Sequence, residues 1–383
     1  MGGKSILIIF PYPHLAYSPT TINLCKLLKG RGNKVTVVYG FEKFWREQAT
    51  RLDGITLKDI SYSKRTIRVA KHVNKLVWKP IAKVLQRLSI LPVYNQLSLR
   101  ELLFSRIIKK ALRTKFDDLI AVDSLPLYWA QQAQRDCHFV SLEVDDGLQL
   151  IGSLDTTRIK SVLIQSEERF QRLFGNAELR RFFVQNAPNF IEPTTRTRAS
   201  TSLIYNGTAW TPFGSLDIIE FVKRYPEYRV HFKGNVHEHL WALVQSRYKD
   251  LIDSGTLSFS EMYLDDSDLR AYLADYSIGF CFYDFNHPAI AQRRFNYETA
   301  PSGKVFLYLS VGMPVVATRI RGFRFIEERQ AGVLLDDHRP ETIKKAVDTI
   351  LSDYNNYSNN ALATGRMFSF DESAKPFVDF ISQ

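Results

Sequence analysis

Short apolar runs and amphipathic segments alternate along most of this chain. The first run, Ser5–Phe10, ends in a proline-containing loop and is followed by a segment with helical spacing, Thr21–Lys29, and a second apolar run, Lys34–Tyr39. Apolar runs of this length are typical of parallel strands buried on both faces. The opening is therefore predicted to be a strand–helix–strand unit of a nucleotide-binding type of fold, without the GxGxxG pattern of a dinucleotide site.

The alternation continues through the first half and restarts after residue 198. Strands are predicted at 55–60, 118–122, 139–142, 162–165, 182–185, 201–205, 229–233, 256–259, 277–283 and 314–318. Residues 189–198 are polar and contain a proline, as is typical of a linker between domains. We predict an α/β protein with a first domain over 1–188, this linker, a second domain over 199–360 and a C-terminal helix over 361–383 that packs back toward the first domain.

The segment Ala300–Asp337 carries the strongest local signal. Ser302, Gly303 and Lys304 open a predicted helix after a polar loop, and Gly312 ends it before a buried strand. A helix N-terminus offers unbonded N–H groups that suit an anion such as a diphosphate. Ser302 is expected to cap the helix and Gly303 to let a ligand approach the backbone, while an ordinary helix–loop–strand unit fits the pattern about equally well.

The long polar stretch before this segment, Asp284–Thr299, is predicted to be a functional loop, because structureless loops of that length are uncommon inside compact domains. It holds Arg293, Arg294 and Glu298.

Composition narrows the class of protein. The chain has 383 residues, 45% hydrophobic and 24% charged, which indicates a globular protein with room for two domains. No apolar run approaches the roughly 20 residues of a membrane span. Three widely separated cysteines form no metal or redox spacing and predict buried thiols in a reducing, cytoplasmic compartment.

Positive charge is concentrated in one part of the chain. Residues 61–116 contain fourteen Lys and Arg and one acid, Glu101, and so carry more positive charge than the net +11 of the whole protein. Within them, basic and apolar residues follow separate helical stripes, which is typical of helices that lie on anionic membranes. The candidate membrane residues are Lys71, Lys75, Trp78, Lys79 and Lys83. A solvated outer helix is the alternative, and nucleic acid is disfavoured because no motif for it is present.

Several acids and one histidine occur at predicted strand or helix ends. His14 follows the first strand, and Glu143, Asp145 and Asp146 follow the strand at 139–142. The carboxyl ends of strands form the ligand edge of open α/β sheets, which makes these residues candidate catalytic bases, although surface or capping roles are more common. Asp265–Asp268 imitates a metal-binding motif but is better explained as helix capping.

The two α/β halves together with PSGKVFLYLSVGMPVVAT resemble the GT-B glycosyltransferases, most closely the retaining nucleotide-sugar transferases of polysaccharide assembly. The resemblance is carried by Ser302, Lys304, Val305, Phe306, Tyr308, Leu309, Gly312 and the strand Pro314–Thr318, preceded by Tyr205-Asn206-Gly207. It implies two Rossmann-like domains with a cleft between them. Three charged residues of the family pattern are absent, because Leu307, Thr208 and Phe213 stand where a ribose-binding Glu and diphosphate-binding Arg and Lys are usual.

The resemblance implies a transferase that uses a nucleotide sugar and a glycan or lipid-linked acceptor. The basic stretch predicts that it works at the cytoplasmic face of a membrane. Neither a metal nor a cofactor is expected, because backbone N–H groups and cations can stabilise the leaving diphosphate. The donor site would include Asn206, Gly207, Arg293, Arg294, Ser302, Gly303, Lys304 and Val305, and the catalytic candidates are Glu298, Asp145, Asp146 and His14. The alternatives are a degenerate binding or assembly protein and a GT-B sugar epimerase.

Overall fold

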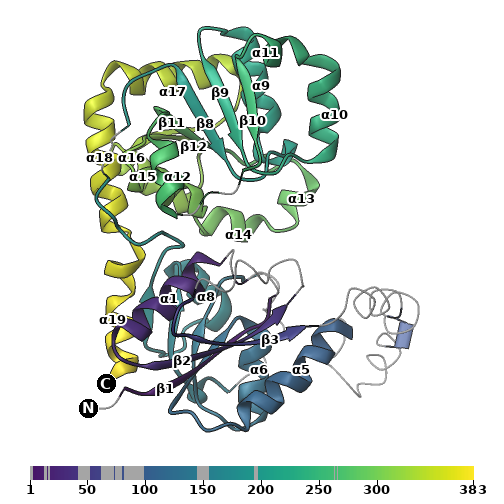
Figure 1. Ribbon diagram of the computed structural model, residues 1–383, viewed down its shortest axis with the longest axis vertical. Helices are drawn as coiled ribbons and strands as arrows, with labels where there is room; N and C mark the ends of the chain where they lie inside the picture. The colour runs from purple at the N-terminus through teal and green to yellow at the C-terminus, as the bar shows by residue number, and fades with distance from the viewer. Residues whose placement is uncertain are drawn as a thin grey trace. The chain divides into compact units, whose positions relative to one another are not determined.

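The computed structural model describes residues 3–12, 15, 18–41, 52–61, 73, 80–81, 99–144, 155–193, 197–262, 264 and 266–383. The chain divides into two compact units (Figure 1). The first comprises Met1–Val184 together with Ala374–Gln383, and the second comprises Gln185–Ser373.

The first unit is built on a seven-stranded sheet in the order β3-β2-β1-β4-β5-β6-β7, and its neighbouring strands pair in parallel. Its strands are β1 (Ser5–Phe10), β2 (Lys34–Phe41), β3 (Thr56–Ser61), β4 (Asp118–Val122), β5 (Cys137–Val140), β6 (Ile159–Ile164) and β7 (Arg181–Phe183). Its described helices are α1 (Pro19–Gly30), α5 (Leu99–Leu112), α6 (Ser124–Gln132), η4 (Thr156–Arg158) and α8 (Glu167–Phe174). The central strands β1 and β4 are almost entirely buried, as their apolar sequences predict.

The end of the chain completes this first unit. The last helix, α19 (Phe370–Ser382), brings Ile381 to the start of β1, where the Lys4 ammonium donates to its carbonyl at 2.8 Å. The ring of Phe377 packs edge-on against His138 at 6.0 Å between centroids, and Phe380 packs against Phe182 at 5.9 Å. Residues far apart in sequence therefore share one apolar core.

The second unit has a six-stranded sheet, also with parallel neighbours, in the order β10-β9-β8-β11-β12-β13. Its strands are β8 (Ser202–Asn206), β9 (Arg229–Lys233), β10 (Leu257–Ser260), β11 (Ile278–Cys281), β12 (Val315–Thr318) and β13 (Gly332–Leu335). The helices pack against the sheet in two apolar clusters, one on each face, to which both strands and helices contribute. They are η5 (Thr211–Phe213), α9 (Ser215–Arg224), α10 (Glu238–Arg247), α11 (Lys249–Asp253), α12 (Asp266–Leu273), α13 (Pro288–Ala291), α14 (Arg294–Thr299), α15 (Gly303–Ser310), η6 (Arg321–Phe323), α16 (Arg324–Glu328), α17 (Pro340–Ser352) and α18 (Tyr354–Met367).

Two segments differ from the sequence prediction. The stretch predicted as a loop at 284–299 contains α13 and α14, which are too short to show helical periodicity. The proposed linker belongs to the second unit, because Arg270 donates to the Asn189 carbonyl at 2.8 Å and the Thr197 hydroxyl donates to the Gly312 carbonyl at 2.9 Å.

Candidate functional site

The second sheet changes the direction of its strand order between β8 and β11. From β8 the chain builds outward through β9 and β10, and from β11 it builds the other way through β12 and β13. Ligands of open α/β sheets bind beyond the carboxyl ends of the strands at such a switch point. Asn206 ends β8, Gly207 follows it, and Phe282 and Tyr283 follow β11, so these residues mark the edge where a ligand is expected.

The side chain of Lys304 reaches this edge from the first turn of α15. Its ammonium nitrogen lies 4.0 Å from the centroid of the Tyr205 ring and 5.9 Å from that of Phe213. Burial lowers the pKa of Lys304, because removal from water disfavours the charged form. Within the described part of the chain no carboxylate pairs with this ammonium. A half-buried, partly desolvated cation without a counter-ion is the arrangement that a bound anion would complete.

Glycine is required at position 207 for this approach. Gly207 has φ +127°, and a Cβ there would stand 3.2 Å from the Lys304 ammonium nitrogen. Gly234 lies against the same loop with φ +124°, and a Cβ on it would lie only 2.5 Å from the Gly207 carbonyl oxygen. The Asn206 N–H donates to the Tyr308 hydroxyl at 2.6 Å, which fixes α15 against the end of β8. Three of the predicted donor-binding residues, Lys304, Asn206 and Gly207, thus lie at this edge of the sheet, and their role in binding a donor stays a prediction.

The other residues at the start of α15 behave differently from the prediction. Ser302 occupies the N-cap position, but its side chain makes no capping hydrogen bond; it interacts instead with Cys281 and Tyr283. A Cβ on Gly303 would meet Asn186 at 3.0 Å, so packing within the unit also favours a glycine there. Val305 is fully buried in the apolar core, and its side chain is not available to a donor.

A second charged group surrounds Glu298, near the end of α14. Its carboxylate accepts from Arg294 Nε at 2.7 Å and from Arg321 at 3.4 Å, and its side chain is 18% exposed. A pocket of about 310 Å³ opens here, lined by four arginines. Arg319 is already paired with Glu327 and with Asp336, the latter at 2.9 Å. The lining residues are Phe285, Arg294, Glu298, Arg319, Ile320, Arg321, Arg324 and Leu334.

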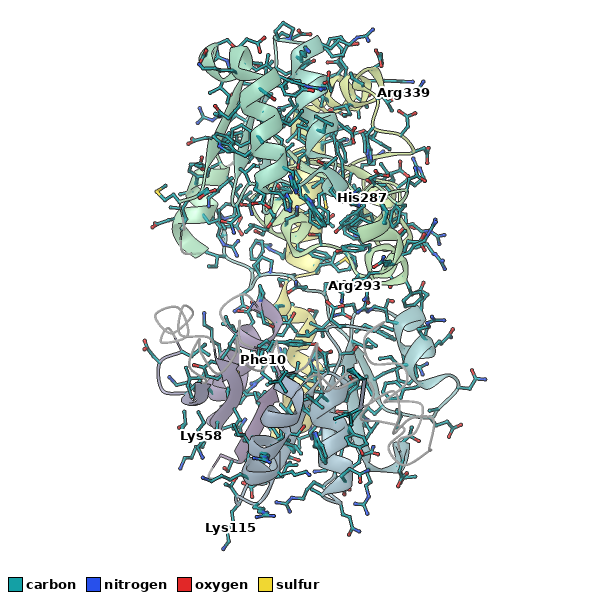
Figure 2. The ribbon with its side chains drawn as sticks, turned by 90° about the vertical axis from the view of Figure 1, so that its right-hand side faces the viewer. Phe10, Lys58, Lys115, His287, Arg293 and Arg339 are labelled. Carbon is teal, nitrogen blue, oxygen red and sulfur yellow. The ribbon has the colours of Figure 1, made fainter. Side chains whose placement is uncertain are left out.

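Aromatic rings connect the two charged groups. The Tyr297 ring lies 5.1 Å from Tyr283 and 6.1 Å from Phe213. The Arg294 guanidinium lies 5.3 Å over the Phe285 ring, which in turn is 6.2 Å from Tyr283. His287 is the N-cap residue of α13 and Arg293 is that of α14, on the segments after β11 (Figure 2). The site is thus a cationic centre with aromatic walls.

The three positions that depart from the family pattern carry no replacement charge. Leu307 is half-buried and packs against the apolar cluster under α15, and Phe213 joins the aromatic wall. Thr208 is exposed. Lys233, a further cation of this region, is buried and donates to the Met262 carbonyl at 2.9 Å.

Sequence reasoning missed Asp123 in the first unit. The switch point of that sheet lies between β1 and β4, and Asp123 follows β4 with φ +59°. Its carboxylate accepts from the Tyr12 hydroxyl at 2.8 Å and from the N–H groups of Leu142 and Glu143 at 2.6 and 3.0 Å. Burial raises the pKa of Asp123 to about 6. Its position at a strand end is a signal that could have identified it.

The remaining candidates cannot be placed. His14, Asp145, Asp146, Lys71, Lys75, Trp78, Lys79 and Lys83 lie outside the described residues. Among the residues that the structure does describe, no group of three His, Cys, Asp or Glu side chains could hold a metal ion. None of the described helices combines the length and the apolar character needed to cross a membrane.

Comparison with known proteins shows similarity in structure only. Neither the scan against protein-family models nor the search of curated proteins found a match. HepE from Anabaena in complex with UDP matches with a TM-score of 0.64 and 11% identity, over 98% of this chain and 99% of that one. Sucrose-phosphate synthase from Thermosynechococcus elongatus matches with a TM-score of 0.65 and 12% identity, over 99% of this chain and 98% of that one. A glycosyltransferase from Rickettsia africae matches with a TM-score of 0.62 and 13% identity, over 99% of this chain and 98% of that one. At such identities the similarity establishes the fold.

Proposed function

We propose that this chain, which has the GT-B fold of the solved structures to which it is similar, is a glycosyltransferase that takes its sugar from a nucleoside diphosphate. The observation that carries the proposal is the desolvated ammonium of Lys304 beside Gly207 at the switch point of the second sheet. Similar structures were solved with UDP and with UDP-glucose, which supports a nucleotide sugar as the donor.

The chemistry follows from where negative charge develops. When the bond from the sugar to the diphosphate breaks, the leaving phosphate gains charge that must be stabilised in place. Lys304 and the N-terminal N–H groups of α15 would supply that stabilisation without a metal ion. Glu298, held by Arg294 and Arg321, is proposed to bind the donor sugar, and a retaining reaction of this kind needs no dedicated side-chain base.

The acceptor is proposed to approach the first unit. We infer a glycan or lipid-linked acceptor of polysaccharide assembly at the cytoplasmic face of a membrane, because the basic stretch 61–116 would favour an anionic surface.

A second candidate function, a binding protein without transfer activity, rests on three positions of the second unit. Leu307, Thr208 and Phe213 leave the usual charged positions empty, and this favours a binding protein that has lost transfer activity.

Ligand-induced thermal stabilisation tests the donor site. We expect UDP or another nucleoside diphosphate to raise the melting temperature of the protein, because a ligand that binds only the folded state stabilises it. Lys304→Met should weaken that binding by about tenfold or more, which corresponds to about 1.4 kcal/mol. Lys249→Met is the matched control, because Lys249 is an exposed lysine of the same unit that pairs with Asp253.

The outcomes separate the two candidates. Binding that depends on Lys304, together with slow release of free sugar from the nucleotide sugar, supports a transferase. The same binding with no hydrolysis or transfer indicates the binding protein. A wild-type protein that is not stabilised by any nucleoside diphosphate or its sugars would overturn the proposed donor site.

A further inference from the structure

The first unit has a pocket at the edge of its sheet opposite to Asp123. The pocket lies between the C-terminal ends of α5 and α6 and has a volume of about 560 Å³. The chain passes from α5 into the start of β4 and from α6 into the start of β5, so this is the amino edge of both strands. Figure 2 shows Lys115, just before β4, at the lower end of the unit, and Phe10, at the end of β1, well above it.

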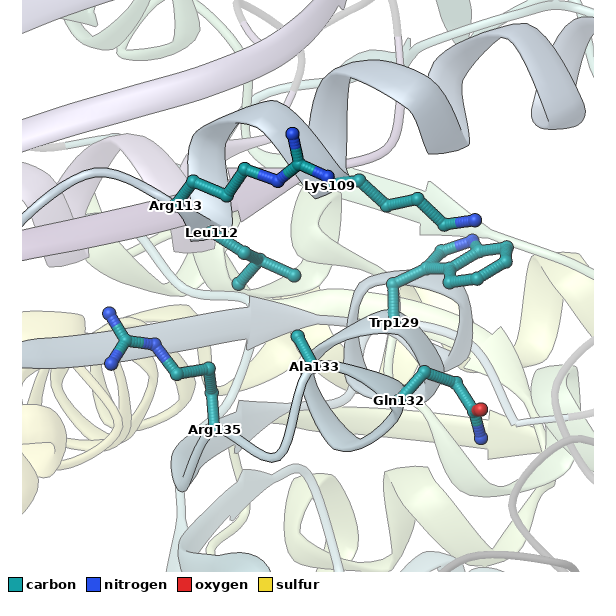
Figure 3. A pocket seen from close by; sticks show the side chains of 7 residues that line it. All are labelled: Lys109, Leu112, Arg113, Trp129, Gln132, Ala133 and Arg135. Atoms are coloured by element: carbon teal, nitrogen blue, oxygen red, sulfur yellow. The ribbon is translucent and has the colours of Figure 1, made fainter.

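Three cations line this pocket and no acid does. Lys109 and Arg113 come from α5 and the turn after it, and Arg135 comes from the loop before β5, with Leu112 between the arginines (Figure 3). Within the described residues none of the three cations forms an ion pair. Arg106 and Lys110 on α5, and Lys115 after it, are exposed and add positive charge to this part of the chain.

Aromatic rings hold two of these cations in place. The Lys109 ammonium lies 3.9 Å from the centroid of the Trp129 ring, and that indole donates to the Ser105 hydroxyl at 2.6 Å. The Arg135 guanidinium lies 4.5 Å from the centroid of the Phe116 ring. The two cationic side chains are therefore already ordered, and less of their conformational entropy would be lost when a ligand binds.

The hydrogen-bonding capacity of Arg135 is largely unused. Its single hydrogen bond among the described residues is a long one, at 3.5 Å, to the Thr114 carbonyl. Its Nε is buried and has no hydrogen-bond partner in the described part of the chain. A buried donor without an acceptor is costly, and the hydrogen bonds within the described residues leave most donors of this guanidinium unsatisfied.

Helix dipoles explain only part of this arrangement. The negative C-terminal end of α5 favours Lys109 and Lys110, which lie in its last turn. The dipole does not explain Arg135, which lies beyond α6 on a separate loop, nor the absence of acids from the lining.

We propose that this pocket binds a phosphate group, with Arg113 and Arg135 donating to its oxygens and Lys109 adding charge. Arginine forks match the geometry of phosphate oxygens, and three cations suit a group that carries one to two negative charges. The site is in the first unit and does not depend on the proposed donor site. The phosphate belongs either to a soluble phosphorylated compound or to an anionic lipid headgroup.

Binding of two kinds of probe distinguishes these sources. Inorganic phosphate and glycerol phosphate are titrated against the full chain by calorimetry, and vesicles of phosphatidylglycerol in phosphatidylcholine are compared with pure phosphatidylcholine by sedimentation. The test variant is Arg113→Gln with Arg135→Gln. The control is Lys34→Gln with Lys58→Gln, which removes the same charge from exposed positions of the same unit that lie outside the pocket.

We expect the pocket variant to bind at least about tenfold more weakly than wild type and the control to change by less than about twofold. Binding of the soluble phosphates identifies a soluble ligand, and binding only to anionic vesicles identifies a lipid headgroup. The proposal is wrong if wild type binds neither probe, or if the two variants weaken binding equally. Arg113→Glu alone, at an exposed position, repeats the test if the double change unfolds the unit.

Discussion

The ammonium nitrogen of Lys304 lies 3.2 Å from where a Cβ on Gly207 would stand, which is closer than an ordinary van der Waals contact. Gly207→Ala should therefore displace Lys304 and weaken nucleoside diphosphate binding by about tenfold, in addition to the backbone strain at φ +127°. Gly255→Ala is the control, because Gly255 also has positive φ, +74°, but has nothing within 4 Å of its Cβ position. Equal effects of the two variants on UDP affinity would contradict a direct role for this contact.

Lys304 is expected to lower the free energy of unfolding of the protein, although it strengthens the binding of a nucleoside diphosphate. Lys304→Met is expected to unfold at the same or a higher urea concentration than wild type at neutral pH, because it removes a desolvated charge. The pKa of Lys304 is lowered in the folded state, so at alkaline pH the unfolded state binds more protons. Wild-type stability should then rise relative to the variant as pH increases. Urea unfolding at neutral and alkaline pH measures this, and a marked loss of stability at neutral pH would show that the ammonium has an unrecognised partner.

Asp123 gives the first unit a pH dependence of the opposite sense. The folded-state pKa of about 6 lies above the ordinary 3.8, so between these values the folded state binds more protons and stability falls as pH rises. The shift corresponds to a loss of up to about 3 kcal/mol. Asp123→Asn keeps an acceptor for the Leu142 and Glu143 N–H groups and should flatten this dependence. Urea unfolding of wild type and variant across this pH range measures the effect. If the free energy of unfolding depends on pH equally in both proteins, another group titrates in this range.

Glu298 is expected to affect turnover more than folding. Its pairs with Arg294 and Arg321 involve exposed arginines, and such pairs contribute about 0–1 kcal/mol to stability. Glu298→Gln should leave the melting temperature and UDP affinity nearly unchanged and lower sugar transfer by about a hundredfold. Glu341→Gln, which breaks an exposed pair with Arg224 in the same unit, should change neither. Full activity in the Glu298 variant would remove this residue from the proposed site.

Leu307 tests whether the site has been rebuilt around Lys304. A glutamate at this half-buried position would face the apolar cluster that Leu307 now contacts. We expect Leu307→Glu to lower stability by about 1–3 kcal/mol and not to strengthen UDP binding. Leu307→Gln separates the effect of charge from that of shape. Tighter UDP binding by the glutamate variant alone would instead indicate a site that has simply lost a ribose ligand.

The predicted two-domain GT-B architecture is confirmed by the similar solved structures. It could be predicted because local sequence patterns determine where the strands lie. The buried run at 315–318 is β12 because apolar β-branched residues show their burial in the sequence itself. Helices α13 and α14 were missed because four and six residues are too few to show a period. The partners of Lys304 depend on sheet order, which places β8 next to β11 although more than seventy residues separate them. Asp123 resembles a capping acid until its burial is known.

The last helix also affects the order in which the protein can fold during synthesis. Most of the first unit leaves the ribosome early, but the rings of Phe377 and Phe380 that pack against His138 and Phe182 are made nearly two hundred residues later. Part of the apolar surface of the first unit therefore stays exposed to solvent while the second unit is translated and folds.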